Sequence, residues 1–285
     1  MNDTFSARGS ILIAGVATID GSTADIAIDE TGTIVAIGDD ARGAIDADII
    51  IDGSERLAIP GLVNTHTHAA MSLLRGYADD MILQDWLSQK IWPLEAHLSG
   101  DDVYAGTRLA CLEMIRSGTV AFNDMYFFPE AAASAALDMG IRMVAGMICF
   151  DMENSYARNA NECIDTGLVL RESLAGQGRV TTAFAPHAPY TVSDPPLVRI
   201  AELSRALGAR VHMHVNETAN EDADSVATYG LSTLRRLDGL GLLNERLVAA
   251  HMVHLTDDDI AATSHAGSSV VHCPESNLKL ASGFC

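Results

Sequence analysis

The pair His66 and His68 is the first set of residues in this 285-residue chain whose types and spacing suggest chemistry. The two imidazoles stand two positions apart at the end of an expected strand, so their side chains point to the same face. Two neutral imidazoles on one face chelate a metal such as zinc. A lone histidine here would more often be a hydrogen-bonded structural residue, but the paired spacing favours a metal site.

A second pair, His212 and His214, is followed by Glu217. His214 lies nearer the end of its expected strand and is therefore the better candidate ligand. Glu217 falls where the strand gives way to a loop, and a carboxylate there can reach a substrate without binding the metal. For His212, a hydrogen-bonded core histidine and a functional role fit the pattern equally well.

His187 and His251 occupy comparable places, because His251 ends one strand-like run and His187 follows another. Taken singly, each is compatible with a structural role. Together with the residues above, they fall at successive strand ends, where barrel enzymes build their active sites. Four histidines lack this support and are not expected to act: His97, His254, His265 and His272.

The elements that must position these residues begin after Pro60-Gly61, where strand-like runs alternate with helix-length segments. This alternation is typical of a parallel α/β fold. We expect a (β/α)8 TIM barrel with about seven of its eight strands present, because few residues remain after the seventh run. The expected strands are residues 62–65, 119–123, 141–149, 180–185, 210–215, 247–253 and 268–273.

Several expected helices carry recognisable end signals. Ser193 precedes a Pro-Pro pair and Gly208 closes the same segment, while Thr256 and Asp259 have the spacing of a capping box. Gly140 closes an alanine-rich helix at residues 129–139. These signals place helices between the strands, as the barrel requires.

Residues 1–58 have a different pattern, in which short β-type runs are broken by Gly and Asp. Asp29-Glu30-Thr31-Gly32 stands between two of these runs as a hairpin turn. We expect a small antiparallel sheet that forms the N-terminal half of a β-sandwich. The barrel then occupies residues 59–285.

The charge and composition narrow the function classes. Lys and Arg number 18 against 38 Asp and Glu, a formal net charge of −20, which argues against nucleic acid and anionic membrane surfaces as partners. No apolar run approaches the roughly twenty residues of a membrane helix. The five scattered cysteines suggest reduced thiols, so we expect a cytoplasmic protein.

Several segments together resemble the metal-dependent amidohydrolase superfamily. They are the run from Pro60 to His68, the His214-x-x-Glu217 pair, Ala250-His251 and the stretch from Pro274 to Leu280. Within that superfamily the chain resembles the 5′-methylthioadenosine/S-adenosylhomocysteine deaminases and the related triazine chlorohydrolases. Asp85-Trp86-Leu87 and Ile91-Trp92-Pro93-Leu94-Glu95 carry this narrower resemblance.

The resemblance implies a metal site and a hydrolytic deamination. It implies that His66, His68 and His214 hold one Zn²⁺ per subunit, with Fe²⁺ as an alternative, and that an aspartate after an eighth strand completes the site. Glu217 and His251 would be catalytic: Glu217 would move a proton to the purine ring nitrogen, and His251 would stabilise the attacking oxygen.

The resemblance also implies a purine nucleoside as substrate, converted to the inosine analogue and ammonia. Glu95 would accept hydrogen bonds from the two ribose hydroxyls, with a solvated helix-face carboxylate as the alternative. Trp86 would pack on the thioether side, with a core tryptophan as the alternative, and His187 would contact the purine or the attacking oxygen. Glu217 would also touch the substrate, and Arg158 is a weak candidate for the homocysteine carboxylate.

The sequence departs from the family pattern at its end, because the expected aspartate ligand is absent. We therefore expect a C-terminally truncated chain that is inactive as written. Two alternatives stay open beside the deaminase: a hydrolase acting on a triazine or other purine-like ring, and an inactive module that binds purines or a partner subunit. A homo-oligomer is also possible, and the sequence does not rank the adenosine derivatives.

Overall fold

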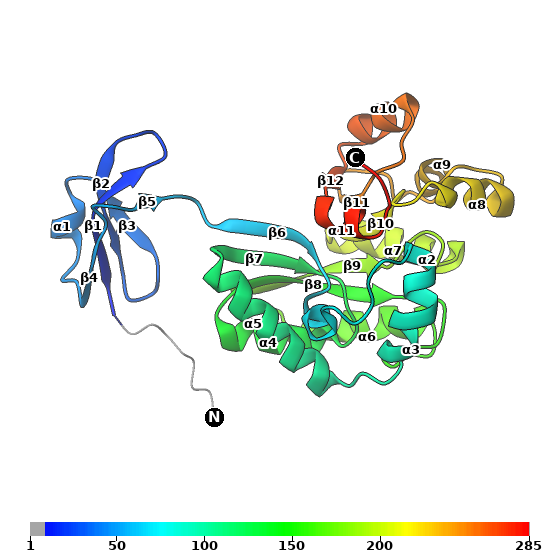
Figure 1. Ribbon diagram of the computed structural model, residues 1–285, viewed down its shortest axis with the longest axis horizontal. Coiled ribbons are helices and arrows are strands. Elements are labelled where there is room, and N and C mark those ends of the chain that lie inside the picture. The colour runs from blue at the N-terminus through cyan, green and yellow to red at the C-terminus, as the bar shows by residue number, and fades with distance from the viewer. Residues whose placement is uncertain (1–8, 285) are drawn as a thin grey trace. The chain divides into compact units, whose positions relative to one another are not determined.

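The computed structural model describes residues 9–284, which form two compact units that divide after Leu62. Figure 1 shows a small sheet formed by the first unit and a larger sheet with surrounding helices formed by the second. Each unit has its own core. The histidines singled out above all belong to the second unit.

The first unit is a five-stranded sheet in the order β3-β2-β1-β4, with β5 also paired to β1. The hairpin turn expected at Asp29–Gly32 joins β2 to β3, and both pairings of β2 are antiparallel. The expectation of a wholly antiparallel sheet was wrong, because β4 and β5 run parallel to β1. The assignment of this sheet to a β-sandwich stays a prediction. Its elements are β1 (Ile11–Thr18), β2 (Thr23–Ile28), β3 (Ile34–Ile37), α1 (Ala41–Ala44), β4 (Ile49–Asp52) and β5 (Leu57–Ala58).

The second unit is built on a seven-stranded sheet whose spatial order, β12 to β6, follows the sequence order in reverse. The pairings from β7 to β12 are parallel, which confirms the α/β barrel class with seven strands. The strands are β6 (Leu62–Thr67), β7 (Thr119–Asp124), β8 (Arg142–Cys149), β9 (Val180–Pro186), β10 (Val211–Val215), β11 (Leu247–His251) and β12 (Ser269–Val271).

Helices follow the strands of this sheet. The capping box predicted at Thr256 and Asp259 is present at the start of α10, and Gly140 and Gly208 end α5 and α7 in the left-handed conformation that glycine adopts readily. The helical elements are η1 (Ala69–Leu74), α2 (Leu83–Trp86), the π-helical turn η2 (Leu87–Ile91), α3 (Trp92–Glu95), α4 (Gly100–Arg116), α5 (Pro129–Met139), α6 (Ala160–Ser173), α7 (Asp194–Leu207), α8 (Asn220–Tyr229), α9 (Thr233–Gly239), α10 (Asp257–Ala266) and α11 (Pro274–Lys279).

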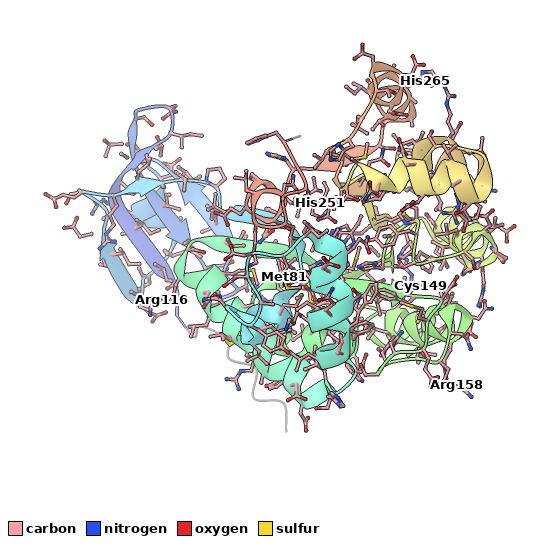
Figure 2. The ribbon with its side chains drawn as sticks, turned by 45° about the vertical axis from the view of Figure 1, so that its right-hand side comes forward. Met81, Arg116, Cys149, Arg158, His251 and His265 are labelled. Atoms are coloured by element: carbon pink, nitrogen blue, oxygen red, sulfur yellow. The ribbon has the colours of Figure 1, made fainter. Side chains whose placement is uncertain are left out.

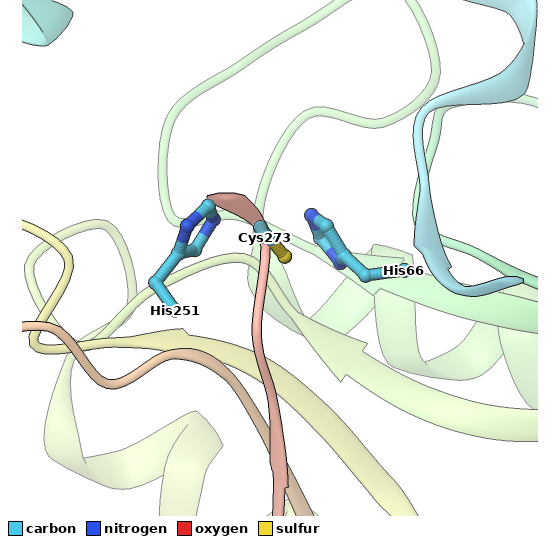
Figure 3. Close-up of side chains that lie close together, drawn as sticks. All are labelled: His66, His251 and Cys273. Carbon is cyan, nitrogen blue, oxygen red and sulfur yellow. The ribbon is translucent and has the colours of Figure 1, made fainter. Parts of the chain in front are cut away.

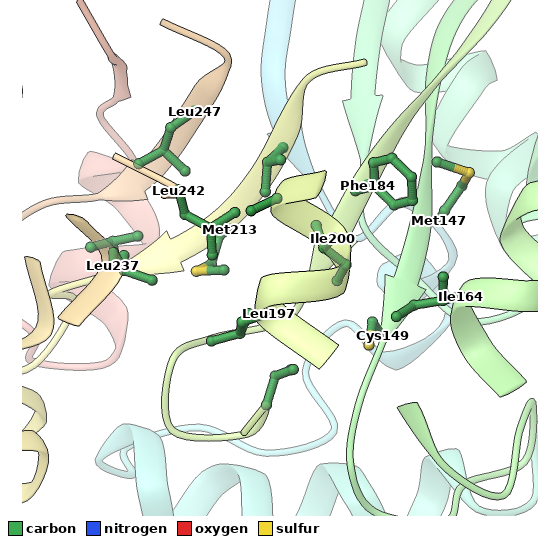
Figure 4. Packing of buried hydrophobic residues seen from close by; sticks show 14 of the residues in the cluster. Met147, Cys149, Ile164, Phe184, Leu197, Ile200, Met213, Leu237, Leu242 and Leu247 are labelled. Carbon is green, nitrogen blue, oxygen red and sulfur yellow. The ribbon is translucent and has the colours of Figure 1, made fainter. Parts of the chain in front are cut away.

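The main core lies between the sheet and its covering helices. Met147 and Phe184 from the strands and Ile164 and Ile200 from α6 and α7 are almost fully buried in one cluster (Figure 4). Close packing also requires Gly146 in β8, where an added Cβ would overlap the backbone oxygen of Asp124. This packing holds the strand ends in fixed positions.

Among the strand ends that differ from the sequence expectation, two fall at predicted site residues. β6 runs on to Thr67, so that His66 lies within the strand rather than after it. β11 stops at His251 instead of Val253, because His251 and Met252 adopt positive φ angles of 76° and 49°. A left-handed backbone ends the strand and turns the chain.

Among the helices of the described residues, none has both the length and the apolar composition that crossing a membrane requires.

Candidate metal centre and active site

The three histidines predicted as metal ligands meet at the carboxyl ends of β6 and β10. The Nε2 atom of His214 lies 3.2 Å from Nε2 of His66 and 3.2 Å from Nε2 of His68. Two zinc-bound imidazole nitrogens at tetrahedral geometry are separated by about 3.3 Å. The spacing of the three nitrogens therefore fits one tetrahedral metal ion.

The hydrogen bonds on the far side of these rings decide where the protons lie. Nδ1 of His68 donates to the backbone oxygen of Met125 at 2.6 Å, and Nδ1 of His214 donates to that of His187 at 2.7 Å. Both Nε2 atoms therefore carry lone pairs that face each other. Burial lowers the pKa of both rings, which keeps them neutral. Facing lone pairs repel unless a cation lies between them, so the donor set fits a metal.

His212, whose role the sequence left open, lies behind His66. Its Nε2 atom is 2.9 Å from Nδ1 of His66, and the residue is fully buried. This contact orients the His66 ring in the way that outer hydrogen-bond partners orient metal-binding histidines. Burial lowers the pKa of His212 to about 3, so it acts as a neutral partner.

Glu217 and His251 form a second group beside the three histidines. Oε2 of Glu217 lies 3.6 Å from Nε2 of His251, and the His251 ring stacks on His214 with 5.3 Å between centroids. Burial, with the charge of Glu221 as a smaller cause, raises the pKa of Glu217 to about 8. Burial lowers the pKa of His251 to about 4. At neutral pH the glutamate holds a proton and the imidazole is neutral.

Cys273 also lies at this centre. Its sulfur and a ring nitrogen from each of His66 and His251 lie within 4.8 Å of one another, and Figure 3 shows the three side chains turned toward a common space. The cysteine is the last residue of the seventh strand-like run, a position that sequence reasoning did not single out.

Three of the four predicted substrate-binding residues line one cavity next to the metal ligands, whereas Glu217 does not line it. Trp86, Glu95 and His187 share this cavity with His68. Glu95 is 7 % exposed, and burial raises its carboxyl pKa to about 7. The His187 ring stacks on Phe150 with 4.4 Å between centroids, and burial lowers its pKa to about 3. Apolar and aromatic side chains complete the walls: Met71, Leu87, Ile91, Trp92, Met125, Tyr126, Phe127, Ile148 and Phe150.

Other candidates lie away from this site. Arg158 is exposed (Figure 2), and its guanidinium pairs with the Glu162 carboxylate at 3.0 Å. It does not line this cavity, nor does it line a neighbouring cavity that also contains Glu95. His97, His265 and His272 are exposed, and His254 contacts the backbone oxygen of Ser282. None of these four histidines lines the cavity.

Sequence reasoning missed two residues that hold the site together. Oδ1 of Asn277 accepts the Nδ1 proton of His251 at 2.7 Å, although Asn277 stands within the stretch from Pro274 to Leu280 that carried the family resemblance. Asp124 ends β7 and accepts hydrogen bonds from the Thr67 hydroxyl and the Ala69 amide. Its place at a strand's carboxyl end was the available signal.

A family model for amidohydrolases matches residues 57–285 of this chain. The chain belongs to the amidohydrolase family. This finding confirms the resemblance carried by the histidine motifs, and with it the expectation of a metal-dependent hydrolase fold.

Relatives within the amidohydrolase family include deaminases with names close to those expected. A 5′-deoxyadenosine deaminase of Methanospirillum hungatei is 50 % identical over 285 residues, covering 99 % of this chain and 63 % of the relative. A 5-methylthioadenosine/S-adenosylhomocysteine deaminase of Archaeoglobus fulgidus is 48 % identical over 242 residues, covering 84 % of this chain and 56 % of the relative. This amidohydrolase chain thus spans less than two thirds of each of these two relatives.

Two solved structures have a similar fold. An adenosine deaminase from Xanthomonas campestris with bound zinc has a TM-score of 0.90 at 43 % identity, covering 97 % of this chain and 64 % of that one. The zinc-bound atrazine chlorohydrolase of Arthrobacter aurescens has a TM-score of 0.86 at 23 % identity, covering 96 % of this chain and 68 % of that one. The second likeness concerns the fold alone.

Proposed function

We propose that the residues of the metal centre and of the adjacent cavity form the larger part of the active site of a zinc-dependent deaminase. This enzyme converts adenosine analogues, altered at the 5′ position, into inosine analogues and ammonia. One observation carries the proposal: Glu95, Trp86 and His187 line a single cavity with the metal-site residue His68. The names of the deaminase relatives support the same reading.

His66, His68 and His214 are proposed to hold the metal. Three imidazoles, with the His214 nitrogen 3.2 Å from each of the other two and all three within 4.8 Å of one another, suit Zn²⁺, and Fe²⁺ accepts the same ligands. A bound Zn²⁺ supplies activation of water at neutral pH.

Glu217 and His251 are proposed to divide the proton transfers. Glu217 is protonated at neutral pH and donates its proton to a purine ring nitrogen, which removes the negative charge that would build on the ring during attack at C6. The Nδ1 proton of His251 is committed to Asn277, so the bare Nε2 accepts a hydrogen bond from the attacking water. Proton donation needs a protonated Glu217, and accepting a hydrogen bond needs a neutral His251. Burial favours both of these states.

Glu95 is proposed to bind the ribose, because one carboxylate offers two acceptors to a vicinal diol. The purine would lie among the aromatic walls near His187, and Trp86 would cover the apolar side of the nucleoside. Burial disfavours the ionised form of Glu95. The hydrogen bonds that the two ribose hydroxyls would donate to its carboxylate favour that form.

A second cavity of about 220 Å³ shares Glu95 and Trp92 with the first, and Met152 lies in its wall. It offers a place for the group at the nucleoside 5′ position. Among the described residues its lining holds no cation, whereas Glu153 contributes a carboxylate. We therefore infer a preference for small uncharged groups, 5′-deoxy or methylthio, over the carboxylate-bearing homocysteine group.

The test is ammonia release by the zinc-loaded full-length protein from 5′-deoxyadenosine, methylthioadenosine, S-adenosylhomocysteine and adenosine. We expect the first two to give the highest kcat/KM. Glu217→Gln is expected to lower kcat roughly 10²- to 10⁴-fold, and Glu172→Gln on the exposed face of α6 serves as the matched control. Absence of ammonia from every adenine nucleoside would sink the proposal.

A further inference from the structure

A cavity of about 390 Å³ lies on the same face of the seven-stranded sheet as the metal ligands, but toward the amino ends of the strands. Strands β6 to β11 all contribute residues to its lining. His212 lines this cavity and also contacts His66, so the His212 side chain stands between the cavity and the metal centre. Small-molecule sites in proteins have volumes of about 300–1,000 Å³, so the cavity is large enough for a ligand.

Arginines occupy the same place at the start of three successive strands. Arg142 begins β8, and Arg179 and Arg210 directly precede β9 and β10. Side chains alternate along a strand, so Arg210 lies on the same face as His212 and His214. All three arginines line the cavity, and all three are exposed. Three accessible guanidinium groups therefore stand at the amino end of one cavity.

The charge of these three arginines is not balanced by a carboxylate. Within residues 9–284, none of the three forms an ion pair, and the cavity lining holds no Asp or Glu. Nη1 of Arg179 donates to the backbone oxygen of Gly140 at 3.1 Å, and Nη1 of Arg210 donates to that of Glu245 at 3.2 Å. The Glu245 carboxylate itself pairs with Arg246. Each guanidinium has five N–H donors, so donors remain for a ligand.

The walls beyond the arginines are mainly apolar. Val144 and Ala183 follow the arginines of their own strands, and Val248 lines the cavity from β11. Val144 pairs in register with Thr181, whose side chain is exposed at the cavity wall. A small inorganic anion at the guanidinium groups would leave these apolar walls in contact with water. The combination of cationic groups at one end and apolar walls beyond them suits an anion with an apolar body.

We propose that this cavity binds an organic anion that has an apolar body and one carboxylate or phosphate head. The head pairs with the guanidinium groups of Arg142, Arg179 and Arg210, whose planar forks match two oxygens of such a group. The body lies against Val144 and Ala183 and removes apolar surface from water. This binding does not depend on the deaminase activity proposed above.

Calorimetric titration of the full-length protein tests the site without any assay of activity. Octanoate and octyl phosphate carry both the anionic head and the apolar body, and at least one of them should bind. Acetate has only the head and octan-1-ol only the body, so each should bind at least tenfold more weakly. The proposal is overturned if neither octyl anion binds, or if octan-1-ol binds as tightly as they do, whatever the protein does with nucleosides.

Arginine variants locate the anionic head. Arg179→Gln keeps an amide donor but removes the charge and the fork, so the affinity for the octyl anion should fall at least tenfold. Arg235→Gln removes one charge from an exposed position of α9 that does not line the cavity, and it should leave the affinity unchanged. Equal affinity in the Arg179→Gln variant and the parent protein would contradict the assignment of the head.

A cavity-filling variant locates the apolar body. Ala183→Leu places three more carbon atoms where the body should lie, so binding of the octyl anion should be lost while Tm does not fall. Ala136→Leu is the matched control, because Ala136 is fully buried in α5 and does not line the cavity. It should lower Tm by overpacking. Unchanged binding in the Ala183→Leu variant would place the ligand elsewhere, and an equal fall in Tm for both variants would show that this space is not open to a ligand.

Discussion

The Nε2 atoms of His68 and His214 lie 3.2 Å apart, although both rings direct their Nδ1 protons away from this contact, toward backbone oxygens. Two lone pairs are thus held face to face by hydrogen bonds on the opposite sides of the rings. Such a pair is stable only with a cation between them, so removing one ring should remove the cation. This relationship leads to the first prediction.

His214→Ala should reduce bound zinc from one equivalent per chain to a small fraction, as measured by elemental analysis after dialysis. The loss follows because two imidazoles bind zinc far more weakly than three. His265→Ala, an exposed position in α10, is the control and should keep full occupancy. Equal zinc content in the two variants would show that the ion binds elsewhere.

Asn277→Leu should lower kcat by roughly 10- to 100-fold with a smaller change in KM, since the loss of an outer hydrogen-bond partner typically costs this much. The Asn277 amide oxygen accepts the Nδ1 proton of His251 and so fixes which ring nitrogen is bare. Asn277→Asp keeps the acceptor, and the added charge should raise the apparent pKa in the rate profile. A pH profile identical to that of the parent protein would show that Asn277 does not act through His251.

Glu95 should make the folded state less stable as the pH rises. Its pKa is about 7 in the folded protein against an ordinary value of 4.5 for glutamate, so between these values the folded state binds more protons than the unfolded state. The free energy of unfolding should therefore fall by about 3 kcal/mol from pH 4.5 to pH 7 and then level off. Denaturation of Glu95→Gln should lack this component, while Glu153→Gln, exposed in the neighbouring loop, should retain it.

Gly146→Ala should destabilise the sheet severely, by more than the 0.5–3 kcal/mol of most substitutions. The new Cβ would overlap the backbone oxygen of Asp124 and lie 2.9 Å from Cβ of Ala185, so three strands would have to separate. Gly178→Ala meets nothing within 4 Å and should be nearly neutral. The measurement is the midpoint of thermal unfolding. Similar midpoints for the two variants would show that the strands adjust freely.

The sequence was sufficient to predict the fold class and the strand ends at which His66, His68 and His214 lie, because both depend on local patterns. Period-two spacing places His66 and His68 on one face, and Thr256 with Asp259 begins a helix without help from distant residues. The hydrogen-bond partners of the site residues were harder to predict from the sequence. The contact between Asn277 and His251 joins residues 26 positions apart and depends on the positive φ at His251, which no local pattern indicates.

The parallel pairing of β4 with β1 was missed for a similar reason. A short apolar run has the same pattern whether its neighbour runs parallel or antiparallel, and only the connection through α1 decides the direction.

Because the backbone of His251 is left-handed, selection for stability and selection for activity should favour different residues at this position in laboratory evolution. A non-glycine residue with a φ of 76° costs about 1–2 kcal/mol relative to glycine, so the chain retains a strained residue where its imidazole is proposed to act. Selection for heat resistance alone should therefore enrich glycine at position 251. Selection for turnover should restore histidine. The frequencies of glycine and histidine after alternating rounds of the two selections would show which selection acts more strongly on this position.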